Sequence, residues 1–358
     1  MSRIIFFCGN SADEWAPPVL DAQGLGGSET AVIKIAALFQ KAGWVVTVYC
    51  HAGRYEGEHE GVLYLEPQRL RPDESCDVLV VWRNPAGHSL PILAPIRLLW
   101  LHDHTYGAGA RDDLHNDAWT RVLGVSAYHR DHLIRAYGLE PARADYVPNG
   151  IDPDRFDPTV RKKLQCVYAS SPDRGLDLLL DLWPHIRGDE DVDLHVAYGW
   201  QNMDALIRLG RGDLLAFKQQ MERKIKDTAG VVWRDRLGQQ ELATLYSESY
   251  AMLYPSHFLE TSCISAMEAM AGGCVPITSS AGNLKDVVGD AGIVVYGPNR
   301  TRSNPYSQAW RDFYTQICKG VLFEMNTRRV AELRCRERAQ GFTWQESFEK
   351  HWLPLVTA

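Results

Sequence analysis

The chain has 358 residues, of which 45% are hydrophobic and 23% charged, and this length predicts two domains with separate cores. The formal net charge is −7 and no long basic run is present, which argues against a nucleic-acid-binding surface. No apolar run approaches the roughly 20 residues that a membrane span needs. We therefore expect a cytoplasmic protein, and peripheral membrane contact stays open because a surface patch leaves little trace in sequence.

The cysteines are irregularly spaced and none belongs to a Cys-x-x-Cys pair. They are Cys8, Cys50, Cys76, Cys166, Cys263, Cys274, Cys318 and Cys335. This pattern predicts buried thiols in a reducing compartment.

The first half of the chain alternates short apolar runs with amphipathic segments. We expect strands at 4–8, 45–50, 77–82, 97–101 and 121–126. We expect helices at 28–41 and from about 127 to 137. Short apolar runs of this kind are typical of buried parallel strands.

Residues 148–158, PNGIDPDRFDP, are rich in turn formers and are the best candidate for an interdomain linker. After them the alternation restarts. We expect strands at 165–169, 194–198, 231–233, 251–254 and 274–278, and helices at 176–183, 241–249 and 261–272. The pattern predicts a second parallel sheet covered by helices, with ligands bound beyond the carboxyl ends of its strands.

The segment 254–277, YPSHFLETSCISAMEAMAGGCVPI, carries the strongest signal. It places Glu260 in a loop and Glu268 eight positions later on a helix that Thr261 or Ser262 can cap. The free N–H groups of the first helical turn form an anion site suited to a diphosphate. Each carboxylate could hold a pair of hydroxyls from a sugar or a ribose. A solvent-facing acidic pair is the alternative interpretation.

This segment resembles the signature of the retaining GT-B glycosyltransferases of family GT4, in which seven residues separate two glutamates. The flanking motifs, Pro255-Ser256 before the first glutamate and residues 275–277 after the second, match the family as well. The resemblance implies that Glu260 holds hydroxyls of the donor sugar and that Glu268 holds the nucleotide ribose. One departure lies at 261–263, Thr-Ser-Cys, where the family commonly has Gly-Phe-Gly.

The resemblance implies an α/β chain with the GT-B fold, in which two Rossmann-like parallel-sheet domains face a central cleft. It implies an N-terminal acceptor domain at 1–152 and a donor domain at 153–342. A final helix at about 343–358, within which 345–355 is the helical core, is expected to pack back on the first domain.

Two further matches lie in the first half of the chain. Gly26 and Gly27 open the first long helix as the family's glycine loop does, and that loop approaches the donor diphosphate. His102 resembles the family's histidine at a strand end, where it contacts the transferred sugar or positions the acceptor. A metal site at 102–104, His-Asp-His, is the competing interpretation.

The segment 170–175, Ser-Ser-Pro-Asp-Arg-Gly, is similar to the family's stretch in which an arginine and a lysine neutralise the leaving diphosphate. Arg174 falls where the lysine is expected. Ser170 stands at the position of the arginine, so one cation is missing, and Arg83 or Arg234 are candidates to replace it.

The resemblance thus implies the catalytic residues His102, Arg174 and Glu260. It implies a donor-binding set of Gly26, Gly27, Ser170, Ser171, Arg174, Leu237, Glu260, Thr261, Ser262, Cys263, Ile264 and Glu268.

The predicted function is metal-independent transfer of a sugar, with retention, from a nucleoside diphosphate sugar to a glycan, lipid-linked or small-molecule acceptor. No cofactor is expected. A sugar-nucleotide epimerase or a phosphorylase of the same fold is one alternative. A nucleotide-sugar-binding protein that has lost catalysis is another, and the missing cation at Ser170 favours it.

Overall fold

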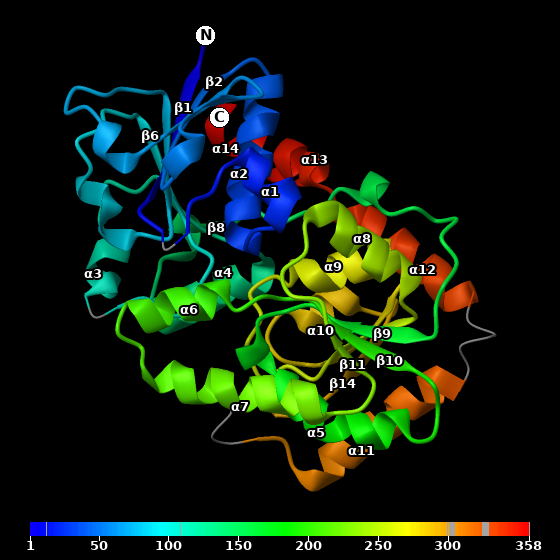
Figure 1. Ribbon diagram of the computed structural model, residues 1–358. Helices are drawn as coiled ribbons and strands as arrows, with labels where there is room; N and C mark the ends of the chain where they lie inside the picture. The colour runs from blue at the N-terminus through cyan, green and yellow to red at the C-terminus, as the bar shows by residue number, and fades with distance from the viewer. Residues whose placement is uncertain (12, 108, 299, 301–304, 324–328, 358) are drawn as a thin grey trace. The chain divides into compact units, whose positions relative to one another are not determined.

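The computed structural model describes residues 1–357 apart from 12, 108, 299, 301–304 and 324–328, and it divides into two compact units (Figure 1). The first unit comprises Met1–Gly150 and Thr343–Ala358, of which Ala358 lies outside the described residues. The second unit comprises Ile151–Phe342. The first junction between the units lies between Gly150 and Ile151, inside the segment that the sequence predicts as a linker.

The described part of the first unit is built on a sheet of strand order β3-β4-β2-β1-β5-β6-β7-β8. The strands are β1 (Arg3–Gly9), β2 (Val45–Cys50), β3 (Gly57–His59), β4 (Val62–Leu65), β5 (Val78–Trp82), β6 (Ile96–Trp100), β7 (Arg121–Gly124) and β8 (Ala144–Tyr146). Neighbouring strands are parallel, apart from the antiparallel pair β3 and β4. The apolar run of β5 is buried along its whole length, as expected for a central parallel strand.

Helices cover this sheet: α1 (Pro17–Gln23), α2 (Gly27–Lys41), α3 (Ala110–Leu114), α4 (Ala127–Tyr137), α13 (Trp344–Ser347) and α14 (Leu353–Thr357). The final helix expected at 345–355 lies within the helical residues 344–357, and a π-helical turn, Phe348–Trp352, separates α13 from α14. A π turn rotates the following side chains relative to an α-helix. Here Phe348 and Trp352 both pack on Phe39 of α2, with ring centroids 4.9 and 6.0 Å apart. Figure 1 shows the red C-terminal segment beside the blue α2.

The second unit has a parallel sheet of order β11-β10-β9-β12-β13-β14 among the described residues. Its strands are β9 (Gln165–Tyr168), β10 (Asp193–Val196), β11 (Val231–Trp233), β12 (Ala251–Tyr254), β13 (Val275–Ser279) and β14 (Ile293–Val295). Its helices are α5 (Leu176–Arg187), α6 (Gln201–Arg208), α7 (Asp213–Asp227), α8 (Gln239–Glu248), α9 (Ile264–Ala271), α10 (Leu284–Val288), α11 (Gln308–Phe323) and α12 (Arg329–Ala339).

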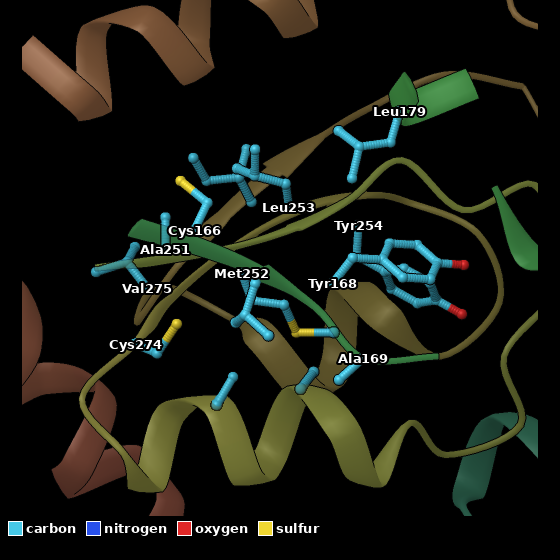
Figure 2. Packing of buried hydrophobic residues seen from close by; sticks show 14 of the residues in the cluster. Cys166, Tyr168, Ala169, Leu179, Ala251, Met252, Leu253, Tyr254, Cys274 and Val275 are labelled. Atoms are coloured by element: carbon cyan, nitrogen blue, oxygen red, sulfur yellow. The ribbon is translucent and has the colours of Figure 1, made fainter. Parts of the chain in front are cut away.

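The strand β12 lies at the centre of the apolar core of the second unit. Figure 2 shows its side chains, from Ala251 to Tyr254, packed among residues of the neighbouring strands such as Cys166 and Val275. The ring of Tyr254 lies against that of Tyr168, with centroids 5.6 Å apart, and both hydroxyls point out of the cluster in the same direction (Figure 2). Parallel sheets with helical cover in both units confirm the predicted α/β class.

Several predicted boundaries shift. The helix expected at 261–272 begins at Ile264, and its N-cap is Cys263 in a left-handed conformation with φ of 71°. The expectation that Thr261 or Ser262 caps this helix is therefore wrong: no side chain hydrogen-bonds the cap. The helix α5 extends to Arg187 rather than 183, with Pro184 in its interior.

All eight cysteines are buried, as predicted, and none of them lies in a disulfide. None of the helices in the described residues combines the length and apolar character that would let it cross a membrane.

Candidate functional site

Two neighbouring strands of the second unit bring the predicted residues together. β9 leads into the loop that carries Ser170 and Arg174, and β12 leads into the loop that carries Glu260. The two strands pair in parallel, so both loops leave the same edge of the sheet. The carboxyl edge of a parallel sheet is where ligands of open α/β folds bind.

The Glu260 carboxylate is buried and held by two donors. Arg174 Nη1 lies 3.2 Å from Oε1 and 3.4 Å from Oε2. The hydroxyl of Tyr254 donates to Oε1 at 2.5 Å. The side chain of Glu260 is only 6% exposed, and a buried carboxylate requires such compensation for its lost hydration. The arrangement fixes the position of this carboxylate before any ligand arrives.

Backbone contacts fix the Glu260 loop as well. Glu260 forms a parallel bridge with Gly282, and the Asn283 N–H donates to the Glu260 carbonyl at 2.7 Å. Gly282 has a φ of +65°, and a Cβ there would lie 2.4 Å from both the nitrogen and the oxygen of Glu260. Only glycine fits this position without displacing Glu260.

A second glycine, Gly175, lets the backbone of the Arg174 loop pack closely against the loop that carries Glu260. Gly175 has a φ of +118°, and a Cβ there would lie 2.6 Å from the Pro255 carbonyl oxygen. The close approach of these two backbones brings Arg174 within reach of Glu260. Both loops of the site therefore depend on a residue without a side chain.

Arg174 is a firmly charged group. Burial lowers the pKa of its guanidinium, but attraction to Glu260 and to other nearby acidic groups outweighs burial and raises the pKa overall. The guanidinium carbon lies 4.1 Å from the ring centroid of Phe258, and the side chain remains 35% exposed. A cation of this kind can accept a second, anionic partner from solution.

The serines of the same loop are engaged within the protein. Ser170 is buried and its Oγ lies 3.0 Å from the Tyr254 hydroxyl. The Ser171 hydroxyl donates to Asp173. Contact of either serine with a phosphate would therefore need its hydroxyl to turn away from its present partner.

The other predicted donor-binding residues lie around α9 and the loop before α8. Glu268 is half-buried on the second turn of α9. Burial first, then Glu260 and more weakly Glu268, raise the pKa of the Cys263 thiol, which places that thiol within electrostatic range of both carboxylates. The remaining members are the half-buried Thr261, Ile264 and Leu237 and the buried Ser262.

Arg234, one of the two candidates for the missing cation, does not contact Glu260. Arg234 follows β11, is exposed, and lies 3.4 Å from Nδ1 of His195. Arg83 belongs to the first unit and pairs with Asp103. Arg174 is thus the cation that contacts Glu260 among the described residues.

The remaining predicted residues lie in the first unit. Gly26 caps α2 and Gly27 begins it, and the Thr30 N–H donates to the Gly26 carbonyl at 3.0 Å. His102 follows β6 and is buried between Trp100 and Trp82, with ring centroids 4.6 and 6.1 Å away. Burial first, and then Arg83 and His129, hold the pKa of His102 well below its usual range, so the imidazole is neutral at neutral pH.

The alternative metal site at 102–104 has the wrong geometry. Asp103 is paired with Arg83 at 2.6 and 3.0 Å, His102 lies among tryptophan rings, and the His104 ring packs on that of His132 at 4.3 Å. Among the residues that the structure describes, no group of three or more metal-ligating side chains is arranged to hold an ion.

Tyr254 and Gly282 are the site residues that sequence reasoning missed. Tyr254 is the first residue of the segment 254–277, but a tyrosine at the end of a buried strand is usually interpreted as a core residue. Gly282 follows β13, and the pair Gly282-Asn283 is a turn signal. That signal predicts a turn and does not reveal that the turn supports Glu260.

Comparisons with known proteins include a family match over the region that carries this cluster. Residues 162–303 match the family model Glycosyl transferases group 1, a range that includes Arg174, Glu260 and Glu268. A D-inositol 3-phosphate glycosyltransferase of Frankia alni is 28% identical over 256 residues. That match covers 63% of this chain and 56% of the relative, so the chain spans little more than half the length of that relative.

Two solved structures show the fold. A glycosyltransferase from Rickettsia africae superposes with a TM-score of 0.72 at 13% identity, over 99% of this chain and 98% of that one. Anabaena HepE, in complex with UDP-glucose, superposes with a TM-score of 0.69 at 13% identity, over 99% and 100%. The fold is therefore that of the GT-B glycosyltransferases. The match to Glycosyl transferases group 1 covers residues 162–303 of the second unit, and the chain as a whole is similar in fold to GT-B glycosyltransferases.

Proposed function

We propose that the chain transfers a sugar from a nucleoside diphosphate sugar to an acceptor, with retention of configuration at the anomeric carbon. The observation that carries the proposal is the buried Glu260 carboxylate, held by Arg174 at the carboxyl edge of a parallel sheet. Its position inside the matched family region supports the assignment. Anabaena HepE, which has the same fold, is known in complex with UDP-glucose, and this supports a nucleoside diphosphate sugar as donor.

The site residues take the following roles in this proposal. Glu260 accepts hydrogen bonds from the donor sugar, and Glu268 accepts them from the ribose. Arg174 and the N-terminal N–H groups of α9 meet the negative charge of the diphosphate. His102, as a neutral imidazole, hydrogen-bonds the sugar or the acceptor hydroxyl.

The reaction then follows from the charge distribution. The acceptor oxygen attacks the anomeric carbon from the face on which the diphosphate departs. The bond from that carbon to the diphosphate oxygen breaks, and the departing phosphate oxygen takes the proton of the acceptor hydroxyl. Since negative charge develops on the diphosphate, a preformed arginine lowers the barrier without reorganisation. We propose that this electrostatic arrangement works without a metal ion.

The acceptor class stays broad: a glycan, a lipid-linked sugar or a small molecule. A cytoplasmic location is part of the proposal, because eight buried unpaired thiols are typical of a reducing compartment.

The proposal is tested first by thermal unfolding with a panel of UDP-, GDP-, ADP- and TDP-sugars. A donor that binds the folded chain raises Tm in a concentration-dependent way. The donor so found is then incubated with candidate acceptors in the presence of EDTA, and the anomeric proton coupling of the product is read by NMR. An incubation without acceptor separates transfer from epimerisation. If no donor shifts Tm and none is consumed, the proposed function is wrong.

A further inference from the structure

The Tyr254 hydroxyl lies between two polar partners in the interior of the second unit. It is 2.5 Å from Glu260 Oε1 and 3.0 Å from Ser170 Oγ. An ionised carboxylate only accepts hydrogen bonds, so the phenol proton lies on the line to Oε1. Ser170 must then donate its own proton to the phenol oxygen. Burial first, and then Glu260, raise the pKa of Tyr254 well above its usual range, so it remains a donor at any physiological pH.

The two oxygens of Glu260 are used unequally. Oε1 accepts from both Tyr254 and Arg174 Nη1, which fills its usual capacity of two hydrogen bonds. Among the described residues, Oε2 accepts one hydrogen bond, from Arg174 Nη1 at 3.4 Å. This contact is longer than the one that the same nitrogen makes to Oε1. Oε2 therefore has the capacity to accept a further hydrogen bond.

We propose that Tyr254 is a positioning residue that holds Glu260 so that Oε2 accepts a hydroxyl of the donor sugar. This inference rests on the proposed function and sharpens it: Glu260 grips the sugar through one oxygen rather than two. It also gives Ser170 a role, because the serine completes the line of hydroxyls that ends on Glu260.

The need for a second donor follows from the two tasks of Arg174. A guanidinium that turns toward a diphosphate weakens its contact with Glu260. Tyr254 is neutral and fully buried, so a phosphate does not draw it away. The carboxylate thus keeps its orientation after the donor binds. An arginine at position 170, where the family has one, would place a charged side chain against the phenol.

The test is Tyr254→Phe, which removes one oxygen and keeps the ring in the core. Isothermal titration calorimetry measures Kd for the preferred donor sugar nucleotide and for the corresponding nucleoside diphosphate. We expect Kd for the sugar nucleotide to rise about tenfold and Kd for the nucleoside diphosphate to change less than about twofold. A purely structural role would weaken both ligands together.

The control variant is Tyr49→Phe in the first unit. Tyr49 is also buried, and its hydroxyl donates to the buried carboxylate of Glu74 at 3.2 Å. This variant makes the same chemical change on the same kind of pair, and we expect neither Kd to move.

Ser170→Ala keeps the test decisive if Tyr254→Phe does not fold. It removes the donor to the phenol and leaves the Tyr254–Glu260 contact in place, so we expect a threefold rise, roughly, in Kd for the sugar nucleotide alone. Equal effects on both ligands, or no effect on the sugar nucleotide, would overturn the inference. If the parent chain binds no sugar nucleotide, the proposed function fails instead.

Discussion

Each unit carries an arginine–carboxylate pair after the end of a strand, and the two pairs differ in their exposure to water. In the second unit the Glu260 side chain is 6% exposed and has Tyr254 as a further donor. In the first unit the side chains of Arg83 and Asp103 are 36% and 41% exposed and form two hydrogen bonds.

Good hydrogen-bond geometry alone does not show which of the two ion pairs has a functional role. The Arg83–Asp103 pair has the better hydrogen-bond geometry, but solvent screens it, and it contributes little to stability. The Glu260 carboxylate loses its hydration, which costs several kcal/mol before its partners compensate, on the order expected for a buried ion. We propose that Glu260 serves ligand binding rather than stability, as the preformed acceptor of the proposed donor site.

The largest difference between the two pairs is expected in folding free energy. Arg174→Met leaves the buried Glu260 without its cation and is expected to lower the free energy of unfolding by about 3 kcal/mol. Arg83→Met is expected to lower it by about 1 kcal/mol or less. Urea denaturation of both variants measures the contrast. Equal losses would show that burial of Glu260 does not distinguish the pairs.

The support of Glu260 by its neighbouring turn is tested with two glycines of the second unit. Gly282→Ala brings a methyl group into the backbone of Glu260 and is expected to lower kcat/KM about tenfold, or 1.4 kcal/mol of transition-state free energy. Gly188→Ala is the matched control, because Gly188 also has a positive φ, +56°, but has no atom within 4 Å of the added Cβ.

Both glycine variants suffer the backbone strain of a positive φ, so both lose stability. The account holds if activity at a temperature well below both Tm values falls for Gly282→Ala alone. A comparable loss of activity in Gly188→Ala would assign the effect to strain instead of to Glu260.

A smaller contrast is expected in the acid stability of the two units. Burial lowers the pKa of His129 in the first unit to about 3, while its Nδ1 accepts from the Val125 N–H. Below about pH 6.5 the His129 imidazole therefore binds a proton in the unfolded chain but not in the folded chain. The folded state loses stability as pH falls from about 6.5 toward 3. Between pH 7.5 and 5.5 this costs about 1.4 kcal/mol.

Urea titrations at these two pH values, for the parent chain, His129→Gln and His195→Gln, measure the contribution. His195 is half-buried in the second unit, where burial first and then Arg234 lower its pKa. We expect His129→Gln to reduce the acid loss more than His195→Gln does. An acid loss unchanged by His129→Gln contradicts the assignment.

The sequence predicts those parts of the fold that depend on local patterns. Continuous apolar runs predict β5 and β12, and the helical spacing of small residues predicts α9. The two-unit α/β class follows, because alternating strands and helices allow few other arrangements.

The predicted helix boundaries are wrong where contacts with residues far away in the sequence determine the local structure. The start of α9 moves to Ile264 because Glu260 bridges Gly282, a residue beyond the next strand. The final helix contains a π-helical turn at Phe348–Trp352, and the rings of Phe348 and Trp352 pack on Phe39 of α2. No pattern within either segment contains this information.

In the candidate site too, local motifs predict some features and long-range contacts determine others. Glu260, Glu268 and Arg174 are predicted from sequence because each lies in a short motif with fixed spacing. The Tyr254–Glu260 and Ser170–Tyr254 contacts depend on which way the side chains at two adjacent strand ends point. Spacing along the chain does not give that direction.

The most direct measurement of the central claim is donor turnover by Glu260→Gln. This variant keeps the size of the side chain and removes the charge that Arg174 and Tyr254 hold in place. Glu241→Gln, an identical change on the exposed face of α8, is the control. We predict that kcat/KM for the preferred sugar nucleotide falls by about 100-fold or more in Glu260→Gln and stays within about twofold in the control. A Glu260→Gln variant that turns over the donor as well as the parent chain would contradict the account.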